Sequence, residues 1–249
     1  MPSTEAGRPR PKYQRIADAL KGAIEAGEYA PGDRLPGENE LMASYGVARM
    51  TARQALGVLR NEGIAEARKG SGVFVRDFRP LRRLGVQRLA REGWSSGRSV
   101  WTADLGDRQL VVDQVEVGTG VAPQRVAEVT GQDVLVRARR FVLDGKPVLL
   151  ATSYLPAALV AGSAVTREDP GPGGIYARLA ELGHAPVRFR EEVRSRMPSH
   201  EEADALGLAD GTPVILICRT AYATEDRVVE VNEMVLDSAA YVLEYDFDA

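Results

Sequence analysis

The segment 35–75 constrains this chain most, because its helix, turn and hairpin signals follow one another without a gap. One short predicted helix ends at Gly46, and a second one ends at Gly63. A basic, glycine-rich turn over 68–72 then joins two short apolar segments as a hairpin. This order predicts a winged helix-turn-helix, in which the second helix enters the major groove of DNA and the hairpin reaches the phosphates or the minor groove.

The second helix of this segment separates an apolar side from a cationic side. At about 100° of rotation per residue, the residues that share the apolar stripe are Ala52, Ala55, Leu56 and Leu59. The arginines on the opposite side are Arg49, Arg53 and Arg60. Arginine suits bidentate contact with guanine and also binds phosphate. Such a face is often only solvated, but its place before a basic wing favours a surface that contacts DNA.

The stretch from Tyr13 to Val75 resembles the GntR family of bacterial transcription regulators through LPGENE, GVARMTARQAL and KGSGVFV. The resemblance implies that the contacts to bases and phosphates of double-stranded DNA come from Asn39, Arg49, Thr51, Arg53, Lys69 and Gly70. We add Arg68 from the basic hairpin. We also add Met50, which replaces a polar residue of the family and suits a thymine methyl group. Gly37 and Ala48 stand where serines usually cap the two helices.

Charge, length and cysteine content agree with a two-part protein that binds DNA at one end. The 249 residues have room for two domains, and the net charge is +3 up to Pro80 and −6 beyond it. The single cysteine, Cys218, excludes a disulfide framework, and its apolar neighbours predict a buried strand residue rather than a nucleophile. No apolar run is long enough for a membrane helix or an export signal, so we expect a cytoplasmic protein with no membrane partner.

We expect four parts along the chain. They are a flexible arm over 1–11, the winged helix-turn-helix domain over 12–78, a charged linker over 79–98 and a second domain over 99–249. In the second domain, strands are predicted at 110–117, 134–143, 148–154, 187–197, 214–222, 228–236 and 241–247, and helices at 123–129, 175–182 and 199–206. Hairpin links such as Asp144-Gly145 make this an α+β domain around an antiparallel sheet.

The second domain resembles the UTRA domain, the ligand-sensing part of the HutC branch of GntR regulators, which has a chorismate-lyase-like fold. The stretches that carry the resemblance are DGKPVLLATSYLP, GGIYARLAELG, GTPVILICRTAY and VVEVNEMVLD. It implies that small effectors bind in a pocket on the sheet, lined by Ser153, Tyr154, Tyr176 and Glu230. Ala151 and Leu236 replace polar sugar contacts of relatives that bind amino-sugar phosphates, so that ligand does not carry over.

Two arginines add a prediction that rests on strand geometry alone. Arg137 and Arg139 are two residues apart on a strand and therefore face the same side. They either clamp an anionic effector through its phosphate or carboxylate, or they form an exposed face paired with nearby acids. Trp101 and Arg98 either line the pocket entrance or end the linker. The adjacent acids Glu191-Glu192 and Glu201-Glu202 point apart, so we expect solvated faces rather than carboxylate dyads.

The sequence offers no catalytic residues, no metal site and no cofactor motif. His184 and His200 are its only histidines, too few for a three-histidine metal site. We therefore expect a transcriptional repressor, a homodimer on a palindromic operator that a small effector releases. The alternatives are a ligand-independent partition or architectural protein that binds DNA and, less favoured, a small-acid enzyme of the chorismate-lyase-like fold.

Overall fold

The structure is a computed structural model, and it forms two compact units, residues 1–79 and 80–249. It describes residues 10–68, 70–77, 80–85, 89–90, 95–96, 100–101, 105, 108–208 and 211–246. Several predictions fall outside these ranges: most of the arm over 1–11, the DNA contact from Lys69, half of the linker over 79–98, and Arg98, expected at the pocket entrance or at the linker end.

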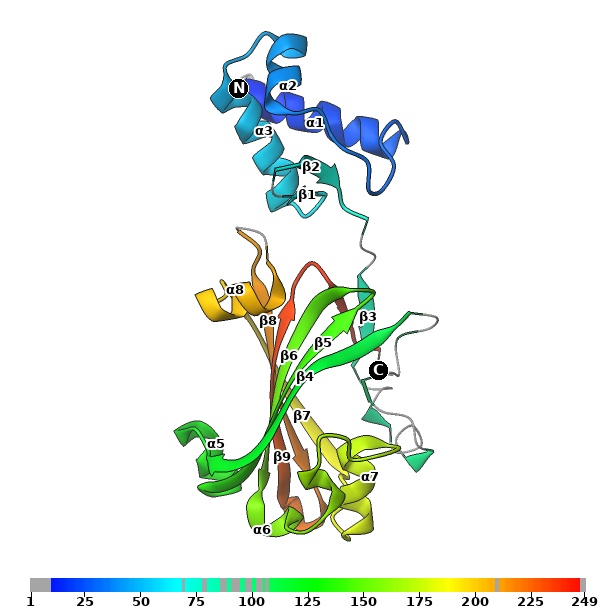
Figure 1. Cartoon of the computed structure of the whole chain (residues 1–249), viewed down its shortest axis with the longest axis vertical. Coiled ribbons are helices and arrows are strands. Elements are labelled where there is room, and N and C mark those ends of the chain that lie inside the picture. Colours follow the sequence, from blue (N-terminus) through cyan, green and yellow to red (C-terminus); the bar gives the residue numbers. More distant parts are fainter. Residues whose placement is uncertain are drawn as a thin grey trace, which may run out of the picture. The chain divides into compact units, whose positions relative to one another are not determined.

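The first unit is the predicted winged helix-turn-helix (Figure 1). Its helices are α1 (Lys12–Glu25), α2 (Glu38–Tyr45) and α3 (Arg49–Asn61). Strands β1 (Ala65–Arg68) and β2 (Gly72–Val75) pair as an antiparallel hairpin, which is the wing. The expected fold of this part is confirmed.

The apolar stripe predicted on α3 is the side that this helix buries. Its four members, Ala52, Ala55, Leu56 and Leu59, join Ile16, Ala17 and Leu20 of α1 in one core. The turn before α3 depends on Gly46, which takes a left-handed conformation at φ 59°. At the start of α2, where serine is missing, Glu40 accepts a hydrogen bond from the Gly37 backbone N–H at 2.6 Å. The opposite side of α3 is thereby left free to face outward.

The second unit contains a six-stranded antiparallel sheet in the order β4-β5-β6-β9-β8-β7. The strands are β4 (Leu110–Val121), β5 (Asp133–Leu143), β6 (Lys146–Pro156), β7 (Arg188–Arg196), β8 (Val214–Tyr222) and β9 (Val228–Asp237). Each of them falls at a predicted strand. The predicted turn at Asp144-Gly145 joins β5 to β6, with both residues at positive φ.

Short helices pack against both faces of this sheet. They are α5 (Gln124–Thr130), α6 (Ala157–Val160), α7 (Gly174–Glu181) and α8 (His200–Leu206), with 3₁₀ turns η2 (Ala164–Thr166) and η3 (Thr224–Asp226). The larger core gathers Leu135, Leu155 and Leu179 under α6 and α7. On the other face, Val126 of α5 packs with Val134 and Val231. Half-buried Cys218 lies on that second face.

Part of the predicted linker is instead a strand of the second unit. Strand β3 (Leu81–Leu84) pairs in parallel with β10 (Tyr241–Glu244), and Arg83 is 3% exposed. A four-residue, arginine-rich segment looks like a linker when read locally. Its strand character comes from a partner 160 residues away, from Leu81 to Tyr241. The first strand of the second unit thus begins directly after the first unit ends.

Two glycines of the first unit give a stability test of opposite sign. Gly46→Ala should lower the free energy of unfolding by about 1 kcal/mol, because a Cβ is disfavoured in the left-handed conformation. Gly57 lies inside α3 with open space where a Cβ would go. Gly57→Ala should therefore raise the same free energy by about 0.5–1 kcal/mol. Urea denaturation of the full chain, followed by circular dichroism, measures both, and changes of the same sign would contradict the assigned turn.

Candidate functional site

The outward side of α3 carries the first candidate surface. The side chains of Arg49 and Arg53 are 61% and 60% exposed, and Met50 between them is 60% exposed. Thr51 is half-buried, and Asn39 at the start of α2 is exposed. Arg60 is half-buried and differs from the sequence prediction, which placed it with the outward arginines. The residues that can meet a groove are therefore those of the first turns of α3.

Glu38 orients both of these arginines, a role that the sequence analysis did not foresee. Its carboxylate lies 2.7 Å from Nε of Arg53 and 3.0 Å from Nε of Arg49. The hydrogen bond from Arg53 holds the pKa of Glu38 below its usual value. Arg49 also donates to Oδ1 of Asn39 at 3.3 Å. Since the groups are exposed, these contacts add little stability and mainly fix the direction of the guanidinium groups.

The wing brings a further cation to the same unit. Arg68 at the end of β1 forms an ion pair with Glu66 at 3.1 Å and lies 4.4 Å from the ring centroid of Phe74. Gly70 has φ 73°, which a turn of this kind requires. The structure thus places Arg68 beside an exposed hairpin tip.

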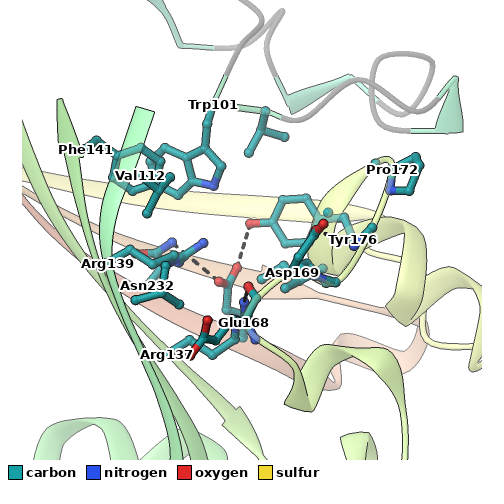
Figure 2. Close-up of a pocket in the computed structure, with 18 of the residues that line it drawn as sticks. Trp101, Val112, Arg137, Arg139, Phe141, Glu168, Asp169, Pro172, Tyr176 and Asn232 are labelled. Carbon is teal, nitrogen blue, oxygen red and sulfur yellow. Dashed lines mark hydrogen bonds between the residues drawn. The ribbon is translucent and has the colours of Figure 1, made fainter. Parts of the chain in front are cut away.

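The second candidate site is a cavity of about 670 Å³ over the sheet of the second unit (Figure 2). Its walls come from β4, β5, β8, β9 and the loop that leads into α7. The polar side chains among the lining residues are Arg137, Arg139, Glu168, Asp169, Tyr176, Arg219, Glu230 and Asn232. The apolar end holds Trp101, Val112 and Phe141, which gather on one side of the cavity in Figure 2. Trp101, for which the sequence left open the pocket entrance or the end of the linker, is therefore in the wall.

A buried polar row crosses the sheet beneath this cavity. Its members are directly opposite one another on successive strands, and they are Arg137, Ser153, Asn232, Arg219 and Glu191. Directly opposite residues project from the same face of a sheet. The first four are no more than 1% exposed. Because buried polar groups are costly unless they are hydrogen-bonded, the partners of this row determine what the site can bind.

Arg137 donates most of its hydrogen bonds to backbone carbonyl groups. Its guanidinium donates to the carbonyl oxygens of Val165, Arg167 and Glu168, the last at 2.8 Å. These residues lead into the loop that forms one wall of the cavity. Burial lowers the pKa of Arg137. The side chain therefore fixes the wall, and it brings a positive charge on which Glu230 and Asp169 act only at longer range.

Arg139 reaches the cavity more directly. It donates to Oγ of Ser153 at 2.6 Å, and its guanidinium carbon lies 5.2 Å from the ring centroid of Trp101. Burial lowers its pKa to about 10. Among the residues that the structure describes, neither Arg137 nor Arg139 has a carboxylate in direct contact, although Glu230 acts on both at longer range. The two arginines do share one side of the sheet, as predicted.

Tyr176 and Glu230 form a hydrogen-bonded group in the centre of the site. The Tyr176 hydroxyl donates to Oε2 of Glu230 at 2.7 Å, and Nδ2 of Asn232 donates to Oε1 at 3.4 Å. Burial raises the pKa of Tyr176, so it stays protonated as a donor. Figure 2 shows the phenol of Tyr176 pointing toward this centre.

Glu191 holds two buried arginines, contrary to the expected solvated face. Its Oε1 lies 2.9 Å from Nε of Arg219 and 2.7 Å from Nη2 of Arg83. Tyr245 donates to its other oxygen at 3.3 Å. Glu192, the next residue, is half-buried and pairs with exposed Arg190, so the two acids do point apart as expected. Glu191 thus connects a cavity residue with strand β3.

Two predicted pocket residues do not line the cavity. Ser153 is fully buried under Arg139 and is not part of the wall. Tyr154 projects from the opposite face and packs with Val126, Val134 and Val231, because neighbouring strand residues alternate in direction. Arg219 and Asn232 were not predicted from the sequence. Each lies two residues along its strand from a buried apolar residue, Ile217 for Arg219 and Met234 for Asn232. Since residues two apart face the same side, strand alternation could have placed both on the inner face.

Within the described ranges, no three His, Cys, Asp or Glu side chains cluster closely enough to hold a metal ion. No helix described there is both long enough and apolar enough to span a membrane.

Comparisons with known proteins match both units. The family model for bacterial regulatory proteins of the gntR family matches residues 12–75, and the UTRA domain model matches residues 108–241. The HTH-type transcriptional regulator Rv0792c of Mycobacterium tuberculosis is 34% identical, covering 89% of this chain and 80% of its own. The HTH-type transcriptional repressor NagR of Bacillus subtilis is 30% identical, covering 96% of each. A crystal structure described as a GntR-family transcriptional regulator has 28% identity and a TM-score of 0.64, covering 96% of this chain and 98% of its own. These relatives are regulators and not enzymes.

Adjacent acids on β7 provide a matched test of the buried ion pairs. Glu191→Gln should lower the free energy of unfolding by about 3 kcal/mol, because two buried guanidiniums lose their carboxylate. Glu192→Gln removes the same charge from an exposed ion pair and should cost less than about 1 kcal/mol. Chemical denaturation of both variants measures the difference. Equal losses would show that Glu191 does not carry the buried pairs.

Proposed function

The chain belongs to the GntR family of bacterial regulatory proteins and carries a UTRA domain, and from this we propose a repressor whose homodimer leaves a palindromic operator when a small anion fills its cavity. DNA binding and transcription regulation are what the family shares, and UTRA domains bind small-molecule effectors. Repression, the dimer, the palindrome and release by the effector are the proposed parts.

Repression is supported by the relatives. NagR of Bacillus subtilis, which matches this chain over nearly its full length, is a transcriptional repressor by name. A repressor of this kind needs a surface that reads DNA, and Arg49, Met50 and Arg53 form an exposed group of the required chemistry. Arginine reads guanine and methionine suits the methyl group of thymine.

A homodimer would give the recognition helix a two-fold partner. Each chain has a single recognition helix, α3. Helix-turn-helix dimers place two such helices about 34 Å apart, on successive turns of DNA. Among the described strands, β4 and β7 are the open edges of the sheet, and exposed valines stand on both, such as Val121 and Val193. These edges suit contact with a second copy.

The anionic effector is supported by one observation: among the described residues no carboxylate is in direct contact with Arg137 or Arg139, and Glu230 acts on both only at longer range, as Asp169 does on Arg137. Both are held by neutral oxygens, Arg137 by carbonyls and Arg139 by a hydroxyl. A charge that is out of water and not paired is unfavourable, so an incoming anion gains more here than at a surface. The N-terminus of α7, with Gly173 and Gly174 in the cavity wall, favours negative charge as well.

The dimer would leave the operator because the effector binds one arrangement of the dimer more tightly than another. The contact that suits this role is Glu191, because it joins Arg219 in the cavity wall to Arg83 of β3. Strand β3 begins at Leu81, directly after the DNA-binding unit ends. An anion bound to Arg219 would compete with Glu191 for that guanidinium. Because Glu191 also pairs with Arg83, the electrostatic environment of Arg83 would change.

The test of this function is the binding of the full chain to operator DNA selected from random duplexes. Arg49→Ala or Arg53→Ala should weaken operator binding by about 1–3 kcal/mol, because a bidentate contact with a base is lost. Fluorescence anisotropy at one fixed salt concentration measures the affinity, and a scrambled duplex reports the non-specific part. The affinity for the scrambled duplex should fall by less than the affinity for the operator.

Arg227→Ala is the matched control, because it removes the same charge from an exposed position in the second unit. It should leave operator affinity unchanged. If the two α3 variants also bound the operator with wild-type affinity, α3 would not be the recognition helix.

A further inference from the structure

We infer that the cavity ligand is a hydroxy acid, an organic anion with a hydroxyl group beside its carboxylate, and that Arg219 and Asn232 recognise these two groups. This inference rests on the proposed function, in which the cavity holds an anionic effector, and it specifies the chemistry of that effector.

Arg219 and Asn232 each keep one polar atom without a partner. They line the cavity and are 0% and 1% exposed. Within the part of the chain that the structure describes, Nη2 of Arg219 and Oδ1 of Asn232 have no hydrogen-bond partner. A buried polar group left unpaired is costly, and such groups mark places where a ligand completes the site.

The other polar atoms of the two side chains are fixed by neighbours. Nε of Arg219 donates to Glu191, and Nη1 donates to the Tyr176 hydroxyl at 3.4 Å. Nδ2 of Asn232 donates to Glu230, so the amide oxygen is the atom that remains free. These two side chains together therefore offer one charged donor and one neutral acceptor, and Nε of Arg137 and Nε of Arg139 also lack a partner among the described residues. A ligand that satisfies both needs an anionic oxygen and a hydrogen-bond donor.

The two free atoms belong to neighbouring positions of the sheet. Arg219 on β8 and Asn232 on β9 are directly opposite each other, which puts their Cβ atoms about 4.5–5.5 Å apart. The carboxylate and the hydroxyl of an α-hydroxy acid are attached to one carbon, so a small ligand presents both groups side by side to these two neighbouring side chains. A fully ionised phosphate offers only acceptor oxygens and would leave Oδ1 of Asn232 without a donor.

The surroundings of this pair suit a carboxylate attached to an apolar body. The guanidinium carbons of Arg139 and Arg219 lie 5.2 Å and 6.0 Å from the ring centroid of Trp101. A carboxylate beside Trp101 therefore has two cations near it. Trp101 and Phe141, whose ring centroids are 4.5 Å apart, offer an aromatic wall for the rest of the ligand (Figure 2).

Three probes of one shape separate the two groups of the ligand. They are 3-phenyllactate, 3-phenylpropionate, which lacks the hydroxyl, and 3-phenyllactamide, which lacks the charge. Calorimetric titration of the full chain should show 3-phenyllactate as the tightest of the three. Loss of either group should weaken binding by about tenfold or more, because a buried polar atom of the site then stays unpaired. Equal affinity for all three probes, or no binding of 3-phenyllactate, would overturn the inference.

Variants of β9 assign the hydroxyl to its acceptor. In Asn232→Ala, 3-phenyllactate and 3-phenylpropionate should bind with equal affinity. Glu233→Gln changes the next residue of β9, which lines no part of the cavity, and should keep the wild-type preference. Circular dichroism and thermal unfolding of the full chain show whether each variant is folded. If Asn232→Ala still prefers 3-phenyllactate over 3-phenylpropionate, the inference is wrong. If that variant does not fold, Asn232→Ser, which also shortens the side chain, replaces it. Asn232→Ser should likewise bind the two probes with equal affinity.

The hydroxy-acid ligand and the proposed repressor function can fail independently of each other. Binding of glucose 6-phosphate without binding of 3-phenyllactate would overturn the hydroxy acid and leave an anion-responsive repressor in place. Binding of 3-phenyllactate in the cavity with no change in operator affinity would support the hydroxy acid and contradict release by the effector.

Discussion

The buried carboxylate of Glu191 is the contact on which the second unit depends most. It compensates Arg219 in the cavity wall and Arg83 of β3, two guanidiniums that are almost completely removed from water. Without it, both charges would be buried with no ion pair, which is far more costly than the loss of a surface pair. The same carboxylate accepts from Nε of Arg219, whose Nη2 has no hydrogen-bond partner among the described residues. The chemistry of the site and the attachment of β3 therefore share one residue.

Each unit orients its functional arginines with an acidic neighbour, but the physical consequences differ. Glu38 contacts Arg49 and Arg53 in water, where the pairing is weak and readily exchanged for phosphate or a base edge. Glu191 acts in a buried setting, where its pairing is strong and contributes to stability. The exposed arrangement suits binding to many DNA sites with selection among them. The buried one suits a receptor whose shape is fixed before its ligand arrives.

The sequence predicted the first unit nearly completely because its determinants are local. Helical periodicity gave the buried side of α3, and Gly46 and Gly63 gave the helix ends. The strands of the second unit followed from alternation and turns. Strand β3, the pairing of Glu191 with Arg219, and the row through Asn232 depend on register between distant segments, which local patterns do not contain. Tyr154 was placed in the pocket together with Ser153, although adjacent strand residues face opposite sides, and alternation alone could have excluded one of them.

In the proposed repressor, one dimer couples operator binding to occupancy of the cavity. Native mass spectrometry of the full chain with its selected operator duplex tests this most directly, because it reports chain number, DNA and ligand in the same ion. We expect two chains on each duplex without ligand, and, on addition of a hydroxy acid, ligand-bearing dimers that have left the DNA. Ligand-bearing protein that stays on the duplex in unchanged amount, or a single chain per duplex, would contradict it.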